Sequence, residues 1–469
     1  MHQSPLVKDL CAALGGENVI FAPSEAAVYD CDAYTLLRNP PQAVLLPQST
    51  AQVADAVKIC RRHGAAIVPR GAGTGLAGGC SPAEHSVVIM LTRISCVLEV
   101  NLRDRFVLVE AGASNSRLAQ ALAGTGYCFA AEPSTHDASS IGGNVATNAC
   151  GPGALKSGAT VKNLLGLEAV LSDGSIVQFG PVAEAASLDL IGLLAGSEGT
   201  LAIVTKVWLR LTPVPPNRRT MQAVFDSAEN AVNCVTQILG AGIIPSAMEL
   251  MDQGLSSAVN RWLGAGMPDG AAASLLIEID GPEAALDAQQ SRILSLLEKN
   301  AAKDVRQASS AQEREDLWKC RKSALSAAGR IMPAYIIEDC IVPRTHLPQM
   351  LQKIAEIAEK KQVPILTAAH AGEGNLHPII LYDERDPAGI ERAVTADREL
   401  LEACIACGGS ATGAHGVGAK KVDFMTRQFQ PADLEALQRV RLAFDPCGLL
   451  NPHKVLPAQA RELTASRKE

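Results

Sequence analysis

The spacing of hydrophobic and polar residues predicts short strands that alternate with helices over residues 42–215. The clearest helix is 50–64, where apolar side chains recur at helical spacing between a Ser-Thr start and Gly64. Two strand-like runs flank Asp173-Gly174 and predict a hairpin that turns there. The proline-rich stretch 212–217 then marks a boundary between domains.

A second pattern follows that boundary, because residues 218–445 repeat strand, helix and strand. This repeat predicts an antiparallel sheet with helices on one face, and the chain is expected to be of the α+β class. The organisation that we predict is an N-terminal helical segment, a first domain, a second domain and a C-terminal tail, at 1–35, 36–215, 216–445 and 446–469.

Composition narrows the function classes. The 469 residues carry a net charge of −7 and only 3% aromatic residues, so we expect neither a basic nor a base-stacking surface for nucleic acid. No run approaches the ~18 apolar residues of a membrane span, and the N-terminus lacks the pattern of a secretory signal. Thirteen scattered cysteines in a chain of this length are typical of a cytoplasmic protein with free thiols.

Three segments rich in glycine and small residues are candidates for ligand binding. "PRGAGTGLAGG" (69–79) follows a strand, and its backbone N–H groups could form a nest for an anion such as a pyrophosphate. A plain structural loop is the alternative. "EPSTHDASSIGGNVATNACGPG" (132–153) is predicted to be a long functional loop, and "GSEGTLAIVT" (196–205) holds Glu198 at a strand start.

Three histidines are candidates for chemistry. His370 and His377 enclose "AGEGNL" between two strand-like runs, which would place both rings at the facing ends of a hairpin. His415 lies between glycines in "TGAHGVG". A metal site, a proton-transfer site and packing all remain open from the residues alone.

Taken together, "PRGAGTGLAGG", "EPST…SIGGNVATNACG", "SEGTLAIVT", "HAGEGNLH", "HGVG" and "NPHKV" resemble the vanillyl-alcohol oxidase / p-cresol methylhydroxylase superfamily. The chain is most similar to its D-lactate dehydrogenase and glycolate oxidase large-subunit branch, across roughly residues 36–458. This resemblance implies a two-subdomain FAD-binding domain, a C-terminal α+β substrate domain with an antiparallel sheet, and a tail that returns to the flavin.

The resemblance also implies a set of FAD contacts. Relatives that attach FAD covalently can use a histidine in the first glycine loop, and residues 70–79 contain none, so FAD is expected to bind non-covalently. The residues implied to contact the cofactor are Arg70, Gly71, Ala72, Gly73, Thr74, Gly75, Leu76, Pro133, Ser134, Ile141, Gly142, Gly143, Asn144, Glu198, Gly199, Ile203 and Asn451, with Lys454 near the flavin edge.

In the resembled family two histidines and the glutamate of a Gly-Glu-His-Gly motif hold a divalent ion. His370 and His377 would be two ligands for Zn, Mn or Fe, but the glutamate position holds Ala414. Glu373 and Glu338 are the candidate substitutes, and a site that works without metal is the alternative.

By the same resemblance, His415 would be the general base for the 2-hydroxyl, and Arg321 would bind the substrate carboxylate. Asn375, His370 and His377 would also contact the substrate. Ile337 stands where some hydroxyglutarate-type relatives carry lysine, which favours a monocarboxylate such as lactate or glycolate.

The resulting hypothesis is FAD-dependent oxidation of a D-2-hydroxy acid to the 2-oxo acid. The alternatives are a flavin-binding electron-transfer or structural subunit of a multi-subunit dehydrogenase, and a non-redox flavin enzyme such as an ether-lipid synthase. The electron acceptor could be a quinone, a cytochrome, an electron-transfer protein or oxygen. We expect a homodimer or a subunit of a complex, in the cytoplasm and peripheral to a membrane only through a partner.

Overall fold

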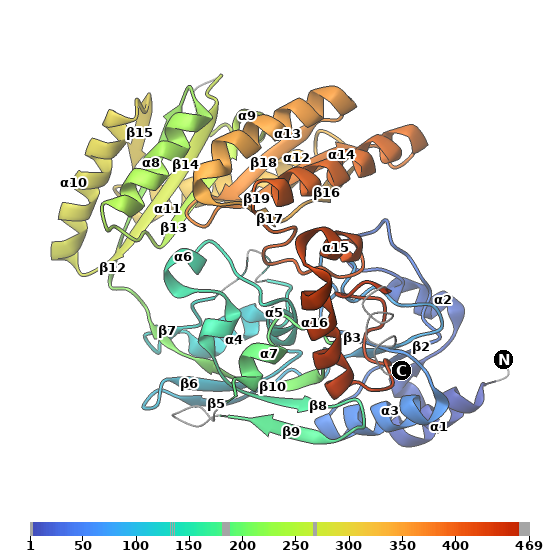
Figure 1. Cartoon of the computed structure of the whole chain (residues 1–469). Helices are drawn as coiled ribbons and strands as arrows, with labels where there is room; N and C mark the ends of the chain where they lie inside the picture. Colours follow the sequence, from blue (N-terminus) through green and yellow to red (C-terminus); the bar gives the residue numbers. More distant parts are fainter. Residues whose placement is uncertain are drawn as a thin grey trace. The chain divides into compact units, whose positions relative to one another are not determined.

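The computed structural model describes residues 3–131, 133, 135, 137–180, 188–265 and 270–458, coloured along the chain in Figure 1. The chain forms two compact units. Unit 1 contains residues 1–151, 158–214 and 414–469, and unit 2 contains residues 152–157 and 215–413.

The first sheet of unit 1 has four strands in the order β1-β2-β4-β3, of which β2, β3 and β4 are parallel. The predicted helix at 50–64 is confirmed as α3, where Ser49 Oγ accepts from Gln52 N and Gly64 ends the helix at φ 64°. Elements of this part are α1 (Pro5–Leu14), η1 (Gly16–Asn18), β1 (Val19–Ile20), α2 (Pro23–Ala26), η2 (Ala27–Tyr29), β2 (Ala43–Leu45), α3 (Thr50–His63), β3 (Ile67–Arg70) and β4 (Val87–Met90).

The second sheet of unit 1 is antiparallel, in the order β5-β6-β10-β8-β9. The hairpin predicted at Asp173-Gly174 is confirmed between β8 and β9. Its strands are β5 (Val97–Asn101), β6 (Phe106–Glu110), β8 (Leu164–Val170), β9 (Ile176–Phe179) and β10 (Ile203–Arg210). The other helices of unit 1 are α4 (Asn115–Leu122), α5 (Ile141–Thr147), η3 (Thr160–Asn163), α7 (Leu190–Leu194), η5 (Val422–Phe424), α15 (Met425–Gln428) and α16 (Pro431–Phe444). Strands β7 (Tyr127–Cys128) and β11 (Thr212–Pro213) form a separate antiparallel pair.

Two features of unit 1 differ from the sequence pattern. The segment 132–153, predicted to be loop, contains α5, because Ser140 Oγ caps the helix by accepting from Gly143 N. Residues 414–445, grouped above with the second domain, lie in unit 1, since Val440 and Phe444 of α16 pack on the core beneath the second sheet.

Unit 2 is built on one antiparallel sheet in the order β15-β12-β14-β13-β18-β19-β16, with β17 also paired to β19. The antiparallel sheet expected for this region is therefore confirmed. Its strands are β12 (Asn217–Phe225), β13 (Ala247–Asp252), β14 (Ala273–Gly281), β15 (Asp304–Gln307), β16 (Ala334–Ile337), β17 (Cys340–Ile341), β18 (Ile365–His370) and β19 (Asn375–Tyr382).

The prediction that helices cover one face of this sheet is wrong, because both faces are apolar and both are covered. Met251, Leu366 and Ala368 pack against α9, α11 and α12, while the alternate residues Leu250 and Ile365 face α8 and α13. Figure 1 shows α10 and α14 on the same side as α8 and α13. The helices are α6 (Ala154–Ser157), α8 (Ala228–Gly240), α9 (Gln253–Leu263), α10 (Glu283–Lys299), α11 (Ala311–Lys322), α12 (Ala324–Ala328), η4 (Arg344–His346), α13 (Leu347–Lys361) and α14 (Pro387–Ala406).

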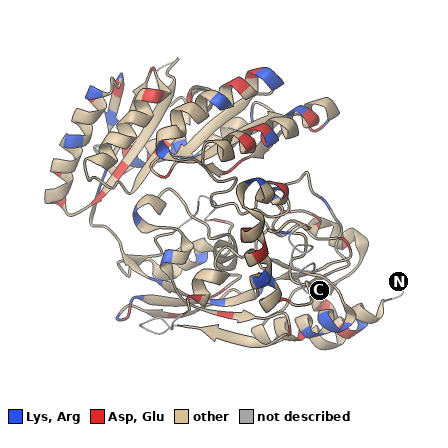
Figure 2. Ribbon diagram, viewed as in Figure 1, with Lys and Arg blue, Asp and Glu red and all other residues tan. Residues whose placement is uncertain are grey.

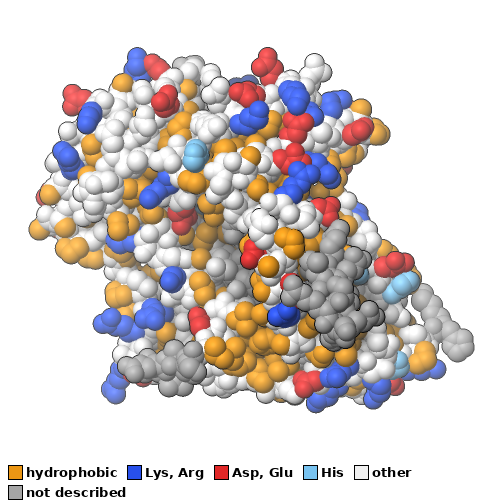
Figure 3. Space-filling model, viewed as in Figure 1, with side chains coloured by type: hydrophobic (Ala, Val, Ile, Leu, Met, Phe, Trp, Pro, Cys, Tyr) orange, Lys and Arg blue, Asp and Glu red, His pale blue; other side chains and the backbone are white. Residues whose placement is uncertain are grey.

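The surface shows mixed charge rather than a stripe of one sign. In Figure 2, basic and acidic residues intersperse along α10, α13 and α14. Figure 3 shows hydrophobic side chains gathered over α7 and α16 of unit 1, where Leu193, Leu437 and Leu442 are exposed. Within the described ranges, no helix has the length and apolar character needed to cross a membrane.

Gly112 lies where the two sheets of unit 1 meet. Its N–H donates to Ile94 O at 2.8 Å, and a Cβ there would lie 1.9 Å from Leu91 O. We predict that Gly112→Ala lowers the free energy of unfolding by about 2–3 kcal/mol, because the backbone must move apart. Denaturant unfolding checks this against Gly240→Ala at the end of α8, where a Cβ meets nothing within 4 Å. Equal stability of the two variants would contradict the close approach.

Candidate functional site

The loop after β3 has the backbone expected of an anion nest. Gly73 has φ 75°, Ala72 is exposed, and the other residues of 71–76 are partly exposed. Among the described residues, none accepts a hydrogen bond from the backbone N–H groups of Ala72 to Leu76. Consecutive N–H groups without protein acceptors suit a phosphate, so this loop fits the pyrophosphate of FAD.

Arg70 shapes this loop from beneath. Its Nη1 donates to Cys31 O at 2.7 Å. The guanidinium packs against Gly73 so closely that a Cβ on residue 73 would lie 2.3 Å from Arg70 Nη2. Only glycine at position 73 allows this packing. The Arg70 side chain therefore supports the loop, and its contact with FAD remains a prediction.

Helix α5 presents small residues to the same loop. A Cβ on Gly71 would lie 2.2 Å from Ser140 Oγ, and one on Gly142 would lie 2.8 Å from Ala111 Cβ. Asn144 is buried and its Nδ2 donates to Asn115 Oδ1 at 2.9 Å. Gly71 thus lets the loop approach the start of α5, and Gly142 lets α5 approach Ala111, while Ile141 lies in the core.

Glu198 is buried and accepts hydrogen bonds from two backbone N–H groups. Its Oε1 accepts from Val417 N at 2.7 Å and its Oε2 accepts from Gly418 N at 2.9 Å. Burial raises the pKa of the Glu198 carboxyl to about 7, although these N–H groups and Lys454 oppose the rise. This carboxylate therefore holds the backbone that directly follows His415.

The tail closes around the glycine loop, as Asn451 shows. Its Nδ2 donates to Gly79 O at 2.8 Å and to Glu198 O at 2.7 Å. Lys454 Nζ donates to Ser81 O at 2.7 Å, and burial lowers the pKa of this ammonium to about 8. The Nδ2 group of Asn451 thus binds the protein backbone and supports the loop, and the contact of Asn451 with FAD remains a prediction.

The other residues predicted to contact FAD are placed as follows. Thr74, Gly75 and Leu76 are partly exposed in the loop, Ala72 is exposed, and Gly199 has φ 70° beside Pro69. Ile203 is buried in the core of the first sheet and Pro133 is buried. Ser134 lies outside the described residues.

In unit 2, strand register brings the predicted histidines onto one face. Glu249 pairs with His370, and His370 pairs with Asn375, on neighbouring antiparallel strands. His377 pairs with Ala368 and so lies diagonal to His370. The His370 and His377 rings meet edge to face with centroids 5.0 Å apart. Asn375 is buried, and its Oδ1 has no hydrogen-bond partner among the described residues.

Arg321 of α11 reaches the same face. Its Nη2 lies 2.8 Å from Glu249 Oε2, and its side chain is 14% exposed, which excludes a solvated surface ion pair. Its Nε, also buried, has no hydrogen-bond partner within the described ranges. Part of a guanidinium thus remains for a ligand beside two histidines.

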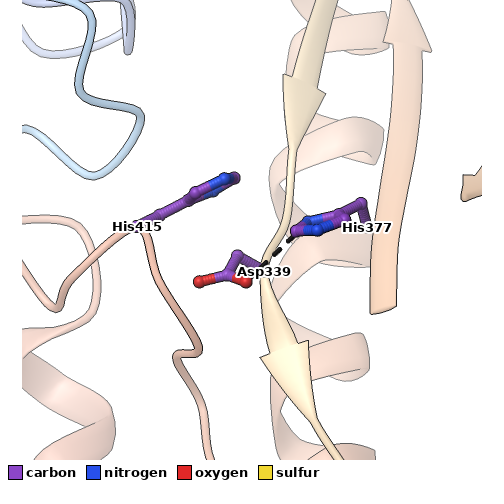
Figure 4. A group of neighbouring side chains, drawn as sticks. All are labelled: Asp339, His377 and His415. Atoms are coloured by element: carbon purple, nitrogen blue, oxygen red, sulfur yellow. Dashed lines mark ion pairs between the residues drawn. The ribbon is translucent and has the colours of Figure 1, made fainter. Parts of the chain in front are cut away.

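Asp339, between β16 and β17, stands beside His377. Its Oδ1 lies 3.8 Å from His377 Nδ1, the ion pair dashed in Figure 4. Its Oδ2 accepts from Gly413 N at 2.8 Å. His415, labelled in the same figure, belongs to unit 1 and is half-buried.

One imidazole and one buried carboxylate of unit 2, those of His377 and Asp339, lie together and suit a divalent ion, so the residues of unit 2 fit one in part. The predicted role of His370 as a ligand remains a prediction. The carboxylate beside His377 is Asp339, rather than the substitutes considered from the sequence. Glu338 is buried and its Oε2 accepts from Asp339 N, while Glu373 is partly buried, which raises the pKa of its carboxyl. Ala414 offers no ligand.

Sequence reasoning missed Glu249 and Asp339. Glu249 lies 121 residues before His370 in the chain, and neither belongs to a glycine-rich motif. A signal existed for Glu249, since it interrupts the apolar strand "SAMELM" at a position that would otherwise be core.

Two family models match this chain, and the second crosses from unit 2 into residues 414–455 of unit 1. The model of the FAD binding domain matches residues 41–180, and the model of the C-terminal domain of FAD linked oxidases matches residues 214–455. Glycolate oxidase subunit GlcD of Escherichia coli K12 is 39% identical over 95% of this chain and 90% of its own.

A probable mitochondrial D-lactate dehydrogenase of Danio rerio is 32% identical over 92% of this chain and 86% of its own. Among solved structures, 4-ethylphenol oxidase from Gulosibacter chungangensis aligns with a TM-score of 0.81 at 20% identity, covering 97% of each chain. That likeness shows the fold expected from the vanillyl-alcohol oxidase superfamily.

Proposed function

Because this chain belongs to the FAD-linked oxidases, we propose that it oxidises a D-2-hydroxy acid to the corresponding 2-oxo acid, with FAD bound non-covalently. The similar proteins named above are a glycolate oxidase subunit and a probable D-lactate dehydrogenase, and both names refer to 2-hydroxy acids. A monocarboxylate of this size is the substrate class that we favour.

The observation that carries the proposal is the polar face of the unit 2 sheet. Arg321 is held there by a buried carboxylate, with His370, His377 and Asn375 on neighbouring strands. A guanidinium binds a carboxylate, while imidazole and amide groups bind the adjacent hydroxyl. These are the two functional groups of a 2-hydroxy acid.

His415 is the proposed base. FAD, when bound, supplies the acceptor for the hydride that leaves C2. His415 takes the hydroxyl proton, so the C2–O bond becomes a carbonyl and two electrons leave the substrate. Gly413 N donates to Asp339 Oδ2. His415 follows Gly413 by two residues, so the length of the chain keeps the His415 backbone within about 7 Å of Gly413.

Two other functions stay in competition. A flavin subunit that only transfers electrons has no need of Arg321, two histidines and Asn375 on one buried face. A non-redox flavin enzyme has no need of a proton acceptor for a 2-hydroxyl. The E. coli relative is named as a subunit, so we propose that electrons pass to a partner protein, a quinone or a cytochrome.

Anaerobic mixing of the purified protein with D- and L-forms of lactate, and with glycolate, tests the proposal. We expect flavin absorbance to bleach with glycolate and the D-form, and acid to release all of the flavin from the protein. Failure of all three acids to bleach a fully loaded protein would remove the proposal.

Arg321→Met should lower kcat/KM by roughly 2–4 kcal/mol of transition-state stabilisation, because a charge-assisted pair with the substrate carboxylate is lost. Flavin content should not change. The matched control is Arg314→Met on the same helix, since Arg314 also pairs with a buried glutamate, Glu278. Comparable kinetic losses in both variants would assign Arg321 to packing alone.

Ala414→Glu should increase both bound divalent metal and the rate of flavin reduction, because it restores an anionic ligand beside His415. Elemental analysis after dialysis measures the first and stopped-flow absorbance the second. Adding His370→Ala to this variant should cancel both gains, since the ligands act as a unit. Unchanged metal content in Ala414→Glu would mean that the histidines serve without metal.

A further inference from the structure

Glu249 joins two groups that the proposed reaction uses. Its side chain is 0% exposed, in the middle of the unit 2 sheet. One oxygen, Oε1, lies 2.6 Å from His370 Nδ1, and the other, Oε2, lies 2.8 Å from Arg321 Nη2. We infer that Glu249 is a positioning residue that fixes the tautomer of His370 and the orientation of Arg321 together; this inference rests on the proposed function.

The contact with His370 selects one form of its ring. A carboxylate oxygen only accepts, so the neutral imidazole must carry its proton on Nδ1 and donate it to Glu249. Nε2 is then left with its lone pair, which can accept from a substrate hydroxyl or bind a metal ion. A carboxylate behind a functional histidine commonly has this effect on the opposite nitrogen.

The contact with Arg321 is an ion pair, in which Nη2 lies 2.8 Å from Glu249 Oε2. Because the guanidinium is planar, a partner held at this end restrains where its remaining N–H groups lie. The carboxylate is thus enclosed between His370 and Arg321, with no exposure of its side chain.

The same sheet provides an internal control. Glu278 of β14 is also buried and accepts from Arg314 Nε at 2.7 Å and Trp318 Nε1 at 2.8 Å. Arg314 and Arg321 are seven residues apart on α11, two helical turns along one side. Both pairs dock α11 on the sheet, but only the Glu249 pair includes a histidine.

Glu249→Gln separates positioning from packing, because glutamine has one acceptor and one donor. Arg321 only donates, so the amide oxygen must turn to Arg321 and the NH₂ group to His370 Nδ1. His370 is then forced to accept at Nδ1 and to carry its proton on Nε2. The substitution preserves shape and inverts the tautomer.

The test uses the full-length, flavin-loaded protein with ¹⁵N-labelled histidine, in wild type, Glu249→Gln and Glu278→Gln, with His370→Ala to assign the signal. Without substrate, we expect the protonated nitrogen of His370 to change from Nδ1 to Nε2 in Glu249→Gln and to remain Nδ1 in Glu278→Gln. This readout does not depend on turnover, so it survives if no 2-hydroxy acid is oxidised.

With D-lactate as the probe, kcat/KM should fall about 10- to 100-fold in Glu249→Gln, as for other carboxylates behind functional histidines, with flavin content unchanged. Glu278→Gln should stay within about threefold of wild type. An unchanged His370 signal in Glu249→Gln, or equal kinetic losses in the two glutamine variants, would overturn the inference. Glu249 would then be only an anchor for α11.

Discussion

The two-residue period of an antiparallel sheet is the constraint on which the candidate site depends. Glu249, Asn375 and His377 share the face of His370 because each occupies a matching parity on β13, β18 or β19. A one-residue shift of any of these strands would move its polar residue to the face covered by α8 and α13. The apolar residues that alternate with the site residues therefore fix the register of the strands, which keeps the polar side chains on one face as well as filling the core.

Charged groups without access to water then determine how the loops are held. Glu198 accepts from two backbone N–H groups, Asp339 accepts from the N–H of Gly413, and Lys454 donates to the carbonyl of Ser81. A buried charge must find such partners or lose its ionisation. Asn451 and Arg70 also donate to backbone carbonyls and so support the glycine loop, while their contacts with FAD remain predictions.

Much of this organisation could be predicted from the sequence, and the exceptions have physical reasons. Helix 50–64, the β8–β9 hairpin and the His370–His377 hairpin depend on local spacing and turn residues, so they were predicted correctly. Helix α5 was missed because its glycines favour loop. Glu249 could not be linked to His370, because strand pairing across 121 residues leaves no periodic trace. Whether a metal binds beside Ala414 depends on whether another carboxylate comes close enough to the histidines. The spacing of residues along the sequence does not determine that distance.

The interrupted sequence of unit 1 has a consequence for biosynthesis. Residues 215–413 emerge from the ribosome as one run and can complete the unit 2 sheet while unit 1 still lacks its final segment. The exposed edge of β3 receives its backbone bridge to Leu450, and Gly79 O its donor from Asn451, only when the last part of the chain appears. A translation product that stops before residue 450 therefore lacks the bridge to β3 and the donor to Gly79 O, although it contains every strand of both unit 1 sheets.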